Sequence, residues 1–196
     1  LMGLKKTKTE LSRFLVTRGV WLVLIEVTIV TLGWTFNPLF NMFILQVIWA
    51  IGISMIILGL LIYLPWTALL IIGIIIVGGH NVLDPVEAAR DHKVGVLWDF
   101  VHHGHFAPYP LAQNRIILIV YAFLPWTGVM ILGYCFGRLF KSSVSPEERR
   151  KWLLIFGIGL LLLFLILRYP NLYGDPQPWS PQGSFTRSLF SFLNVD

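Results

Sequence analysis

The chain has 196 residues, of which 56% are hydrophobic and only 13% charged, with a formal net charge of +5. A soluble domain of this size needs much more polar surface, so the composition excludes a water-soluble fold. The basic residues stand at the ends of apolar runs, where membrane topology accounts for them, and nucleic acid is not an expected partner. The single cysteine, Cys135, allows no intrachain disulfide.

The apolar residues form runs of about 20, long enough for helices to cross a hydrocarbon core of roughly 30 Å. These runs lack the alternation of barrel strands, and lipid leaves the backbone to satisfy its own hydrogen bonds, so helices are expected. We therefore predict an all-α fold, a polytopic transmembrane helical bundle with five full spans and the start of a sixth. All of residues 1–196 are expected to form a single membrane domain, with the lipid bilayer as its first partner.

Proline and polar residues set the expected boundaries in chain order. Turns or stops at Asn37-Pro38, Pro65 and Asp84-Pro85 separate the first three spans. Pro125 is expected to kink the fourth span near its centre. Polar loops occupy 84–114, 138–150 and 168–186. The five spans are expected at 14–36, 39–64, 66–83, 115–137 and 151–167.

The distribution of lysine and arginine predicts the orientation. With the N-terminus inside, the outer side holds only Arg90, Lys93, Arg115, Arg168 and Arg187. The inner side holds more basic residues: Lys5, Lys6, Lys8, Arg13, Arg138, Lys141, Arg149, Arg150 and Lys151. The bias favours a cytoplasmic N-terminus. Trp34, Trp66, Trp98 and Trp179 near the expected interfaces are typical of an aromatic belt.

Three polar residues inside the first two spans are candidates for a buried polar path. Arg18 lies near the cytoplasmic end of span one, where it either snorkels to the headgroups or holds an anionic ligand. Glu26 and Gln46 reach nearly the same depth on antiparallel spans, so we expect a hydrogen bond between their side chains, directly or through water. This pair serves either as interhelical glue or as part of a functional path.

The outer end of span three carries His80, Asn81 and Asp84 after Gly78-Gly79. His80 and Asp84 are four residues apart, hence on one face of a continuing α-helix. A carboxylate that accepts from an imidazole fixes its tautomer, as a general base or an acceptor-hydroxyl site requires. The alternative is that these three residues only finish the helix at the interface.

A loop stretch offers the further imidazoles of His102, His103 and His105 beside Asp99. Neighbouring histidines rarely converge on one ion unaided, so no metal is expected, and the three are interpreted as solvated or substrate-contacting. Their roles stay open.

Six motifs together resemble the bacterial relatives of heparan-α-glucosaminide N-acetyltransferase, a family of multispan membrane acyltransferases. The motifs occur in the family's order, and the resemblance extends from about residue 10 to the end of the chain. They are 17–26 (TRGVWLVLIE), 33–37 (GWTFN), 45–52 (LQVIWAIG), 79–84 (GHNVLD), 124–133 (LPWTGVMILG) and 173–179 (YGDPQPW).

The resemblance implies an enzyme of the bacterial inner membrane that takes acetyl from acetyl-CoA, its co-substrate, on the cytoplasmic side. It delivers the acetyl group to an amino sugar or glycan on the other side. The family's catalytic histidine belongs to helices that precede Leu1, so it matches no residue here and the catalytic residue stays unknown. The chain is thus expected to be part of a larger domain, inactive alone, with homo-oligomers left open.

Two other classes remain as alternatives. A transporter or permease would use the same buried polar residues as a translocation path, although no internal repeat is visible. A non-catalytic membrane scaffold would leave Glu26 and His80 unexplained.

Overall fold

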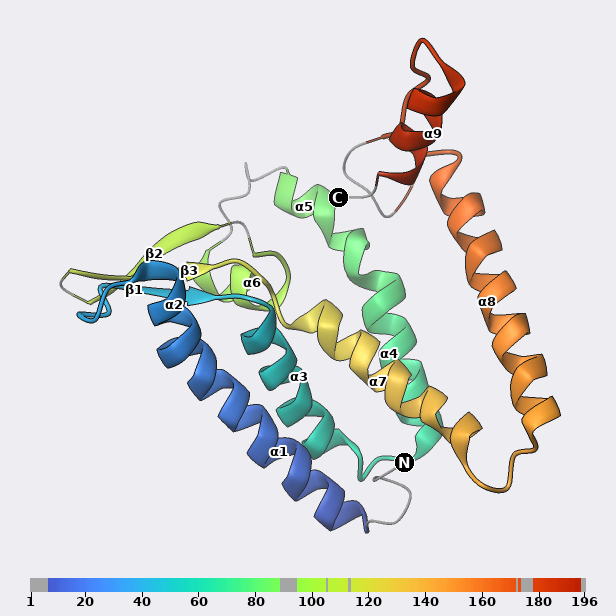
Figure 1. Cartoon of the computed structure of the whole chain (residues 1–196), viewed down its shortest axis with the longest axis horizontal. Helices are drawn as coiled ribbons and strands as arrows, with labels where there is room; N and C mark the ends of the chain where they lie inside the picture. Colours follow the sequence, from blue (N-terminus) through green and yellow to red (C-terminus); the bar gives the residue numbers. More distant parts are fainter. Residues whose placement is uncertain are drawn as a thin grey trace. The chain divides into compact units, whose positions relative to one another are not determined.

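The computed structural model of the protein describes residues 7–88, 95–104, 106–112, 114–171, 173 and 178–194. The chain forms two compact units, Leu1–Arg138 and Leu139–Asp196, which we describe separately (Figure 1). Several residues used in the predictions lie outside the described ranges: Lys5, Lys6, Arg90, Lys93, His105 and 174–177.

The first unit opens with a long apolar helix. Helix α1 (Lys8–Ile25) begins at a capping box, in which Thr7 and Glu10 satisfy each other's backbone amides. It continues through a π-helical segment, η2 (Glu26–Val30), into α2 (Thr31–Thr35). Phe36 then adopts a left-handed φ of 49°, and the turn expected at Asn37-Pro38 follows. The first predicted span is therefore confirmed as one helical rod.

A small sheet contradicts the all-α prediction. Strands β1 (Met42–Leu45), β2 (Ala107–Ala112) and β3 (Arg115–Ile119) form a sheet of order β1-β3-β2. Strand β3 pairs parallel with β1 and antiparallel with β2. The aromatic and β-branched residues of β1 and β3 pack well on a pleated surface, and hydrophobicity alone does not separate these segments from a helix. The open edges of this sheet have no partners in lipid, which places it outside the hydrocarbon core.

The sheet shortens two of the five expected spans. The second span is helical only in α3 (Val47–Leu61), because 42–45 belong to β1. The fourth is helical only in α7 (Leu124–Phe136), because 115–119 form β3. Pro125 consequently stands in the first turn of α7, where it lacks no helical hydrogen bond, and the predicted mid-span kink is wrong.

The third span continues beyond the predicted stop. Helix α4 (Trp66–Gly79) tightens into a 3-10 helix, η3 (His80–Leu83), and α5 (Asp84–Ala88) follows directly. Pro85 does not interrupt the chain, because it occupies the first turn of α5, where its missing N–H is not needed. A separate short helix, α6 (Val96–Val101), precedes the sheet hairpin.

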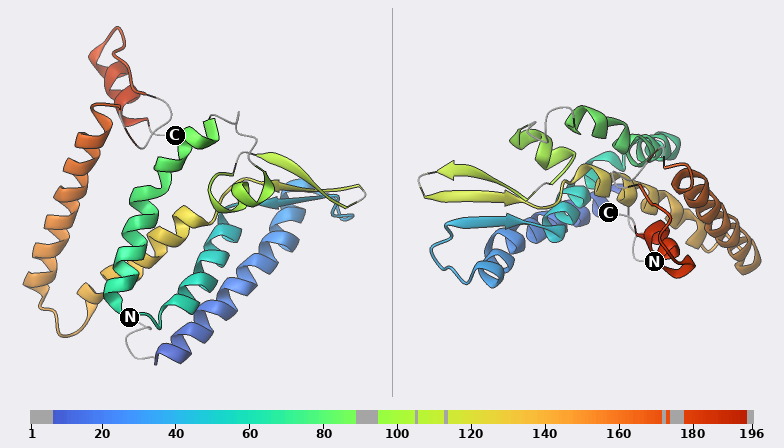
Figure 2. Two further views of the ribbon diagram at one scale, coloured as in Figure 1. Left: turned by 180° about the vertical axis from the view of Figure 1, so that it is seen from behind. Right: turned by 90° about the horizontal axis from the view of Figure 1, so that it is seen from above.

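Four rods of the first unit pack in the order α1, α3, α7, α4, with the sheet at one end (Figures 1 and 2). Leu58, Ile62, Leu69, Ile131 and Cys135 form its buried core. We call the end that holds the sheet, α5 and α6 the sheet end. The predicted orientation expects this end on the extracytoplasmic side of the membrane.

Close backbone contact joins α1 and α3. A Cβ atom added at Gly19 would lie 2.5 Å from the carbonyl oxygen of Gly52, so only glycine fits there. Further along the same helix pair, the buried Ser12 hydroxyl of α1 donates to the Gly59 carbonyl of α3 over 2.6 Å. Small residues and a hydroxyl that bonds a carbonyl are the usual contacts between helices in lipid.

The second unit holds α8 (Pro146–Arg168) and the amphipathic α9 (Phe185–Leu193). Ser145 caps α8, which begins before the expected residue 151. The buried Arg168 guanidinium donates to the carbonyls of Ser191, Phe192 and Asn194 at the end of α9. A cation there balances the helix dipole, so Arg168 fixes the end of α9.

Within the part of the chain that the structure describes, three helical rods are long and apolar enough to cross a membrane: Lys8–Thr35, Trp66–Glu87 and Pro146–Arg168. Helix α3 is apolar but shorter. Many large apolar side chains of these rods are exposed, as expected where lipid covers them. The protein is an integral membrane protein, and of the five full spans predicted, three have the length.

Candidate functional site

Glu26 lies at the sheet end, in the first turn of η2, and is completely buried. Its Oε1 accepts from the backbone N–H of Gln46 over 2.6 Å. Gln46 is the N-cap residue of α3 and offers no side-chain cap itself, so Glu26 caps α3 from a neighbouring helix. The expected Glu26–Gln46 contact exists, but its donor is the backbone amide rather than the side chain.

The π-helical segment explains how Glu26 reaches that position. Its extra residue per turn aims the carboxylate at α3. Thr31, also fully buried, donates its hydroxyl to the Glu26 carbonyl over 2.9 Å and accepts from the Ile44 N–H over 3.3 Å. Thr31 thus joins η2 to β1. Glu26 Oε2 has no hydrogen-bond partner among the described residues, so this carboxylate is only half satisfied.

Arg18 does not join Glu26. Its side chain is exposed, and its guanidinium lies over the Phe14 ring, 5.4 Å from the ring centroid. A cation above an aromatic face is a mild stabilising contact. Of the three residues proposed for a buried polar path, Glu26 and Gln46 therefore contact each other, whereas Arg18 lies apart from them on the surface.

A second polar site is built around Glu87 on α5. We call Glu87, Trp98, His102, His103 and His80 the Glu87 cluster. Glu87 is 1% exposed and its Oε2 accepts from the Trp98 indole over 3.1 Å. The same oxygen lies 3.0 Å from His102 Nδ1, and Glu87 Oε1 lies 2.7 Å from His103 Nδ1. One buried carboxylate therefore holds the loop that follows α6.

His102 is enclosed between rings and acceptors. It is 2% exposed, and its ring lies 4.2 Å from the His80 ring and 4.7 Å from the Trp98 ring. Its Nδ1 faces Glu87, while its Nε2 lies 3.0 Å from the His80 carbonyl oxygen and 3.9 Å from an Asp84 oxygen. Both ring nitrogens of His102 therefore face oxygen atoms, so the ring is held from two sides.

His103 differs from His102 in its exposure. Its side chain is 46% exposed, while Nδ1 is held by the buried Glu87 carboxylate. A donor at Nδ1 makes Nε2 the basic nitrogen of a neutral ring. A histidine that is oriented by a buried carboxylate and reaches the surface is the arrangement of a general base.

The predicted His80–Asp84 pair takes another form. Asp84 Oδ2 accepts from Asn81 Nδ2 over 3.0 Å, whereas the buried His80 Nδ1 has no hydrogen-bond partner among the described residues. The 3-10 geometry of η3 is the reason, since residues three apart line up there and residues four apart do not. Asn81 and Asp84 therefore border the Glu87 cluster, to which His80 contributes its ring and its carbonyl.

A tyrosine–aspartate pair joins the sheet to this site. The Tyr109 hydroxyl on β2 donates to Oδ2 of the buried Asp99 on α6 over 2.6 Å. Burial, then the hydrogen bond to Asp99 and its charge, raise the pKa of Tyr109 to about 12. The phenol stays protonated and anchors β2 to α6, three residues before His102.

Sequence reasoning missed Glu87, Trp98 and Tyr109 as members of the site. Glu87 stands three residues after Asp84, a spacing that puts both carboxylates on one face of a helix. This spacing could have indicated Glu87, but only if the helix is expected to continue through Pro85. Among the described residues, no three His, Cys, Asp or Glu side chains are arranged to hold a metal ion.

Long apolar helices that carry buried carboxylates and an oriented histidine at one end define a polytopic membrane protein with a polar site at one membrane face. The family model described as heparan-alpha-glucosaminide N-acetyltransferase, catalytic, matches residues 2–169. The chain belongs to this family of membrane N-acetyltransferases, as its motifs predicted. The match ends before the 173–179 motif. No curated protein and no solved structure matches the chain.

Proposed function

We propose that the full-length protein transfers acetyl from cytoplasmic acetyl-CoA to an extracytoplasmic amino sugar or glycan. Family membership supports the reaction class. The observation that carries the proposal is the pairing of half-exposed His103 with buried Glu87 at the sheet end. This is the end that the positive-inside rule assigns to the acceptor side.

The chemistry needs a base on the acceptor side. As the sugar nitrogen bonds to the acetyl carbon, the carbon–sulfur bond of the donor breaks and the thiolate of CoA leaves. The nitrogen must give up one proton, and His103 Nε2 accepts it. The proton then passes to solvent or to the thiolate, so charges and atoms balance.

Glu87 acts mainly by position in this scheme. The Glu87 carboxylate also contacts His102 Nδ1 and the Trp98 indole, so it is itself held in place by several partners. What Glu87 gives His103 is therefore a fixed tautomer and ring orientation, as a carboxylate does in a catalytic triad. His103 is the proposed catalytic base, and Glu87 is a positioning residue.

Transfer of a labelled acetyl group across a vesicle membrane tests the proposal. The full-length protein is reconstituted in sealed proteoliposomes with glucosamine inside and acetyl-labelled acetyl-CoA outside, and labelled N-acetylglucosamine is counted inside. His103→Gln is expected to lower the transfer rate about 100-fold or more, because a positioned base contributes that much. The control Lys141→Ala, an exposed change in the second unit, is expected to keep the wild-type rate.

Two results would contradict this scheme in different ways. Wild-type transfer by His103→Gln would remove His103 from the reaction while leaving the acetyltransferase intact. An absence of label transfer to any amino sugar or envelope glycan, together with measurable flux of unlabelled sugar, would favour the transporter alternative.

A further inference from the structure

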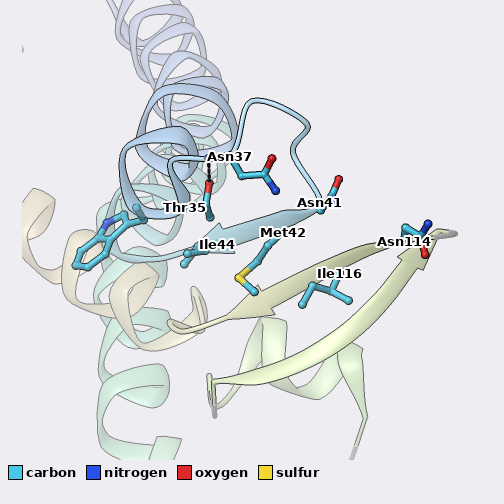
Figure 3. Close-up of a pocket in the computed structure, with 8 residues that line it drawn as sticks. Thr35, Asn37, Asn41, Met42, Ile44, Asn114 and Ile116 are labelled. Atoms are coloured by element: carbon cyan, nitrogen blue, oxygen red, sulfur yellow. Dashed lines mark hydrogen bonds between the residues drawn. The ribbon is translucent and has the colours of Figure 1, made fainter.

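An open pocket of about 660 Å³ lies between α2 and the sheet (Figure 3). Its volume falls in the range of sites for small molecules. None of the described residues that line it is charged, so this lining does not suit the phosphates of CoA or another anion. The lining residues are Trp34, Thr35, Asn37, Asn41, Met42, Ile44, Asn114 and Ile116.

The pocket and the Glu87 cluster use opposite faces of the sheet. Met42 pairs with Ile116, so their side chains share the face that lines the pocket. Tyr109 pairs with Ile117, one residue further along β3, so it belongs to the other face, where it bonds Asp99 beside the cluster. A ligand in the pocket therefore does not occupy the proposed transfer site.

Three asparagines give the pocket its polar character. Asn37 Oδ1 accepts from the Leu39 N–H over 2.9 Å, which fixes the amide and directs its NH₂ group elsewhere. Within the described residues, the side-chain amides of Asn41 and Asn114 make no hydrogen bond. Asn114 is held in a left-handed turn with φ 59°, at the tip of the β2–β3 hairpin. Donors and acceptors on separate elements thus border one cavity.

Trp34 adds an aromatic ring to the apolar lining that Met42, Ile44 and Ile116 form. The indole is 63% exposed although it is one of the largest apolar groups of the chain. A flat aromatic face stacks on the C–H face of a sugar ring, and amides pair with the neighbouring hydroxyls of that ring. Exposed tryptophan beside neutral amides is suited to an uncharged polyhydroxyl ligand.

We infer that this pocket binds one pyranose unit of a glycan and anchors it apart from the acetylated residue. The choice of sugar rests on the proposed function, whereas the pocket and its neutral chemistry do not. Since the transfer site lies beyond the other face of the sheet, the acceptor is a chain of several sugars rather than a free amino sugar. An oligosaccharide therefore binds more tightly than its monomer.

Binding without donor tests this inference. The full-length protein in detergent is dialysed to equilibrium against a labelled β-1,4-linked glucosamine tetrasaccharide or against glucosamine, with no acetyl-CoA. Trp34→Ala and the double variant Asn41→Ala/Asn114→Ala are each expected to raise the tetrasaccharide Kd about threefold to tenfold or more, since one or two contacts are lost. The matched control Trp21→Ala removes another exposed indole of the same rod and is expected to leave Kd unchanged.

Loss of Trp34 could also change how the helix sits in the membrane. The double asparagine variant avoids this effect, because Asn41 and Asn114 are exposed and their truncation leaves the core intact. No saturable tetrasaccharide binding, or a Kd unchanged in both variants, would overturn the inference and leave Trp34 as an interfacial anchor. Pocket-dependent binding of the tetrasaccharide without any acetyl transfer would contradict the proposed function but not this inference. Acetyl transfer to glucosamine and to the tetrasaccharide with equal KM would contradict the inference that the pocket anchors the glycan, but not the proposed function.

Discussion

Replacing Glu87 with alanine should destabilise the sheet end more than any exposed substitution. The change removes the carboxylate that faces His102 Nδ1, His103 Nδ1 and the Trp98 indole. His102, 2% exposed, then loses the hydrogen-bond partner of its Nδ1 in a buried position. His103 is nearly half exposed and can bond water instead, so its loss contributes little.

The expected magnitude follows from the burial of both partners. Breaking a buried ion pair by removing one side costs about 3–5 kcal/mol. A domain of this size loses roughly 2–4 °C in Tm for each kcal/mol. We therefore expect Glu87→Ala to lower Tm by about 10 °C.

The assay is thermal unfolding in detergent, followed by intrinsic fluorescence. The control Glu147→Ala removes an exposed glutamate and is expected to change stability by about 0.5 kcal/mol or less. The double variant Glu87→Ala/His102→Phe removes both polar partners and keeps an aromatic ring, so it should recover part of the loss. A single variant that melts within 2 °C of wild type, or a double variant no better than the single, would refute the ion-pair reasoning.

Three further outcomes are expected. Gly19→Ala should lower the free energy of unfolding by about 1–3 kcal/mol in thermal unfolding, because the added Cβ would lie 2.5 Å from a backbone oxygen. The control Gly33→Ala, with open space around it, should be neutral or stabilising. Equal effects of the two changes would contradict the close helix contact. Glu26→Ala should cost about 1–3 kcal/mol and speed amide exchange at the start of α3, and unchanged exchange there would argue against the cap. Tyr109 has a folded pKa of about 12 against 10 unfolded, so its stabilising effect is full below pH 10 and lost towards pH 12; Tyr109→Phe should flatten that alkaline loss, and identical pH profiles would rule it out.

The membrane class and the first rod were predictable from the sequence, because length and apolarity decide them, and the family was predictable from the motifs that resemble it. The sheet was not. Segments 42–45 and 115–119 are apolar and continuous with helical runs, and they become strands only because β1 and β3 pair across the chain. A partner distant in sequence leaves no periodic signal in either segment.

The site was predictable in part. The Glu26–Gln46 contact followed from equal depth on antiparallel segments, but a backbone amide as donor depends on where α3 begins. Asp84 bonds Asn81 rather than His80, because η3 is wound more tightly than an α-helix. The convergence of His102 and His103 on Glu87 required the helix to pass Pro85, which local rules treated as a stop.

The parallel pairing of β1 with β3 has a consequence for biogenesis. Met42 leaves the ribosome about 70 residues before Ile116, its partner, and the whole α4–α5 rod is synthesised in between. The central strand is thus the last of the three to be made, and β1 waits with an unpaired edge until it arrives. If α4 inserted the wrong way round, β3 would emerge on the opposite side of the bilayer and the sheet would never close. Pairing of β1 with β3 therefore requires that the chain between them return to the side of the bilayer on which β1 lies.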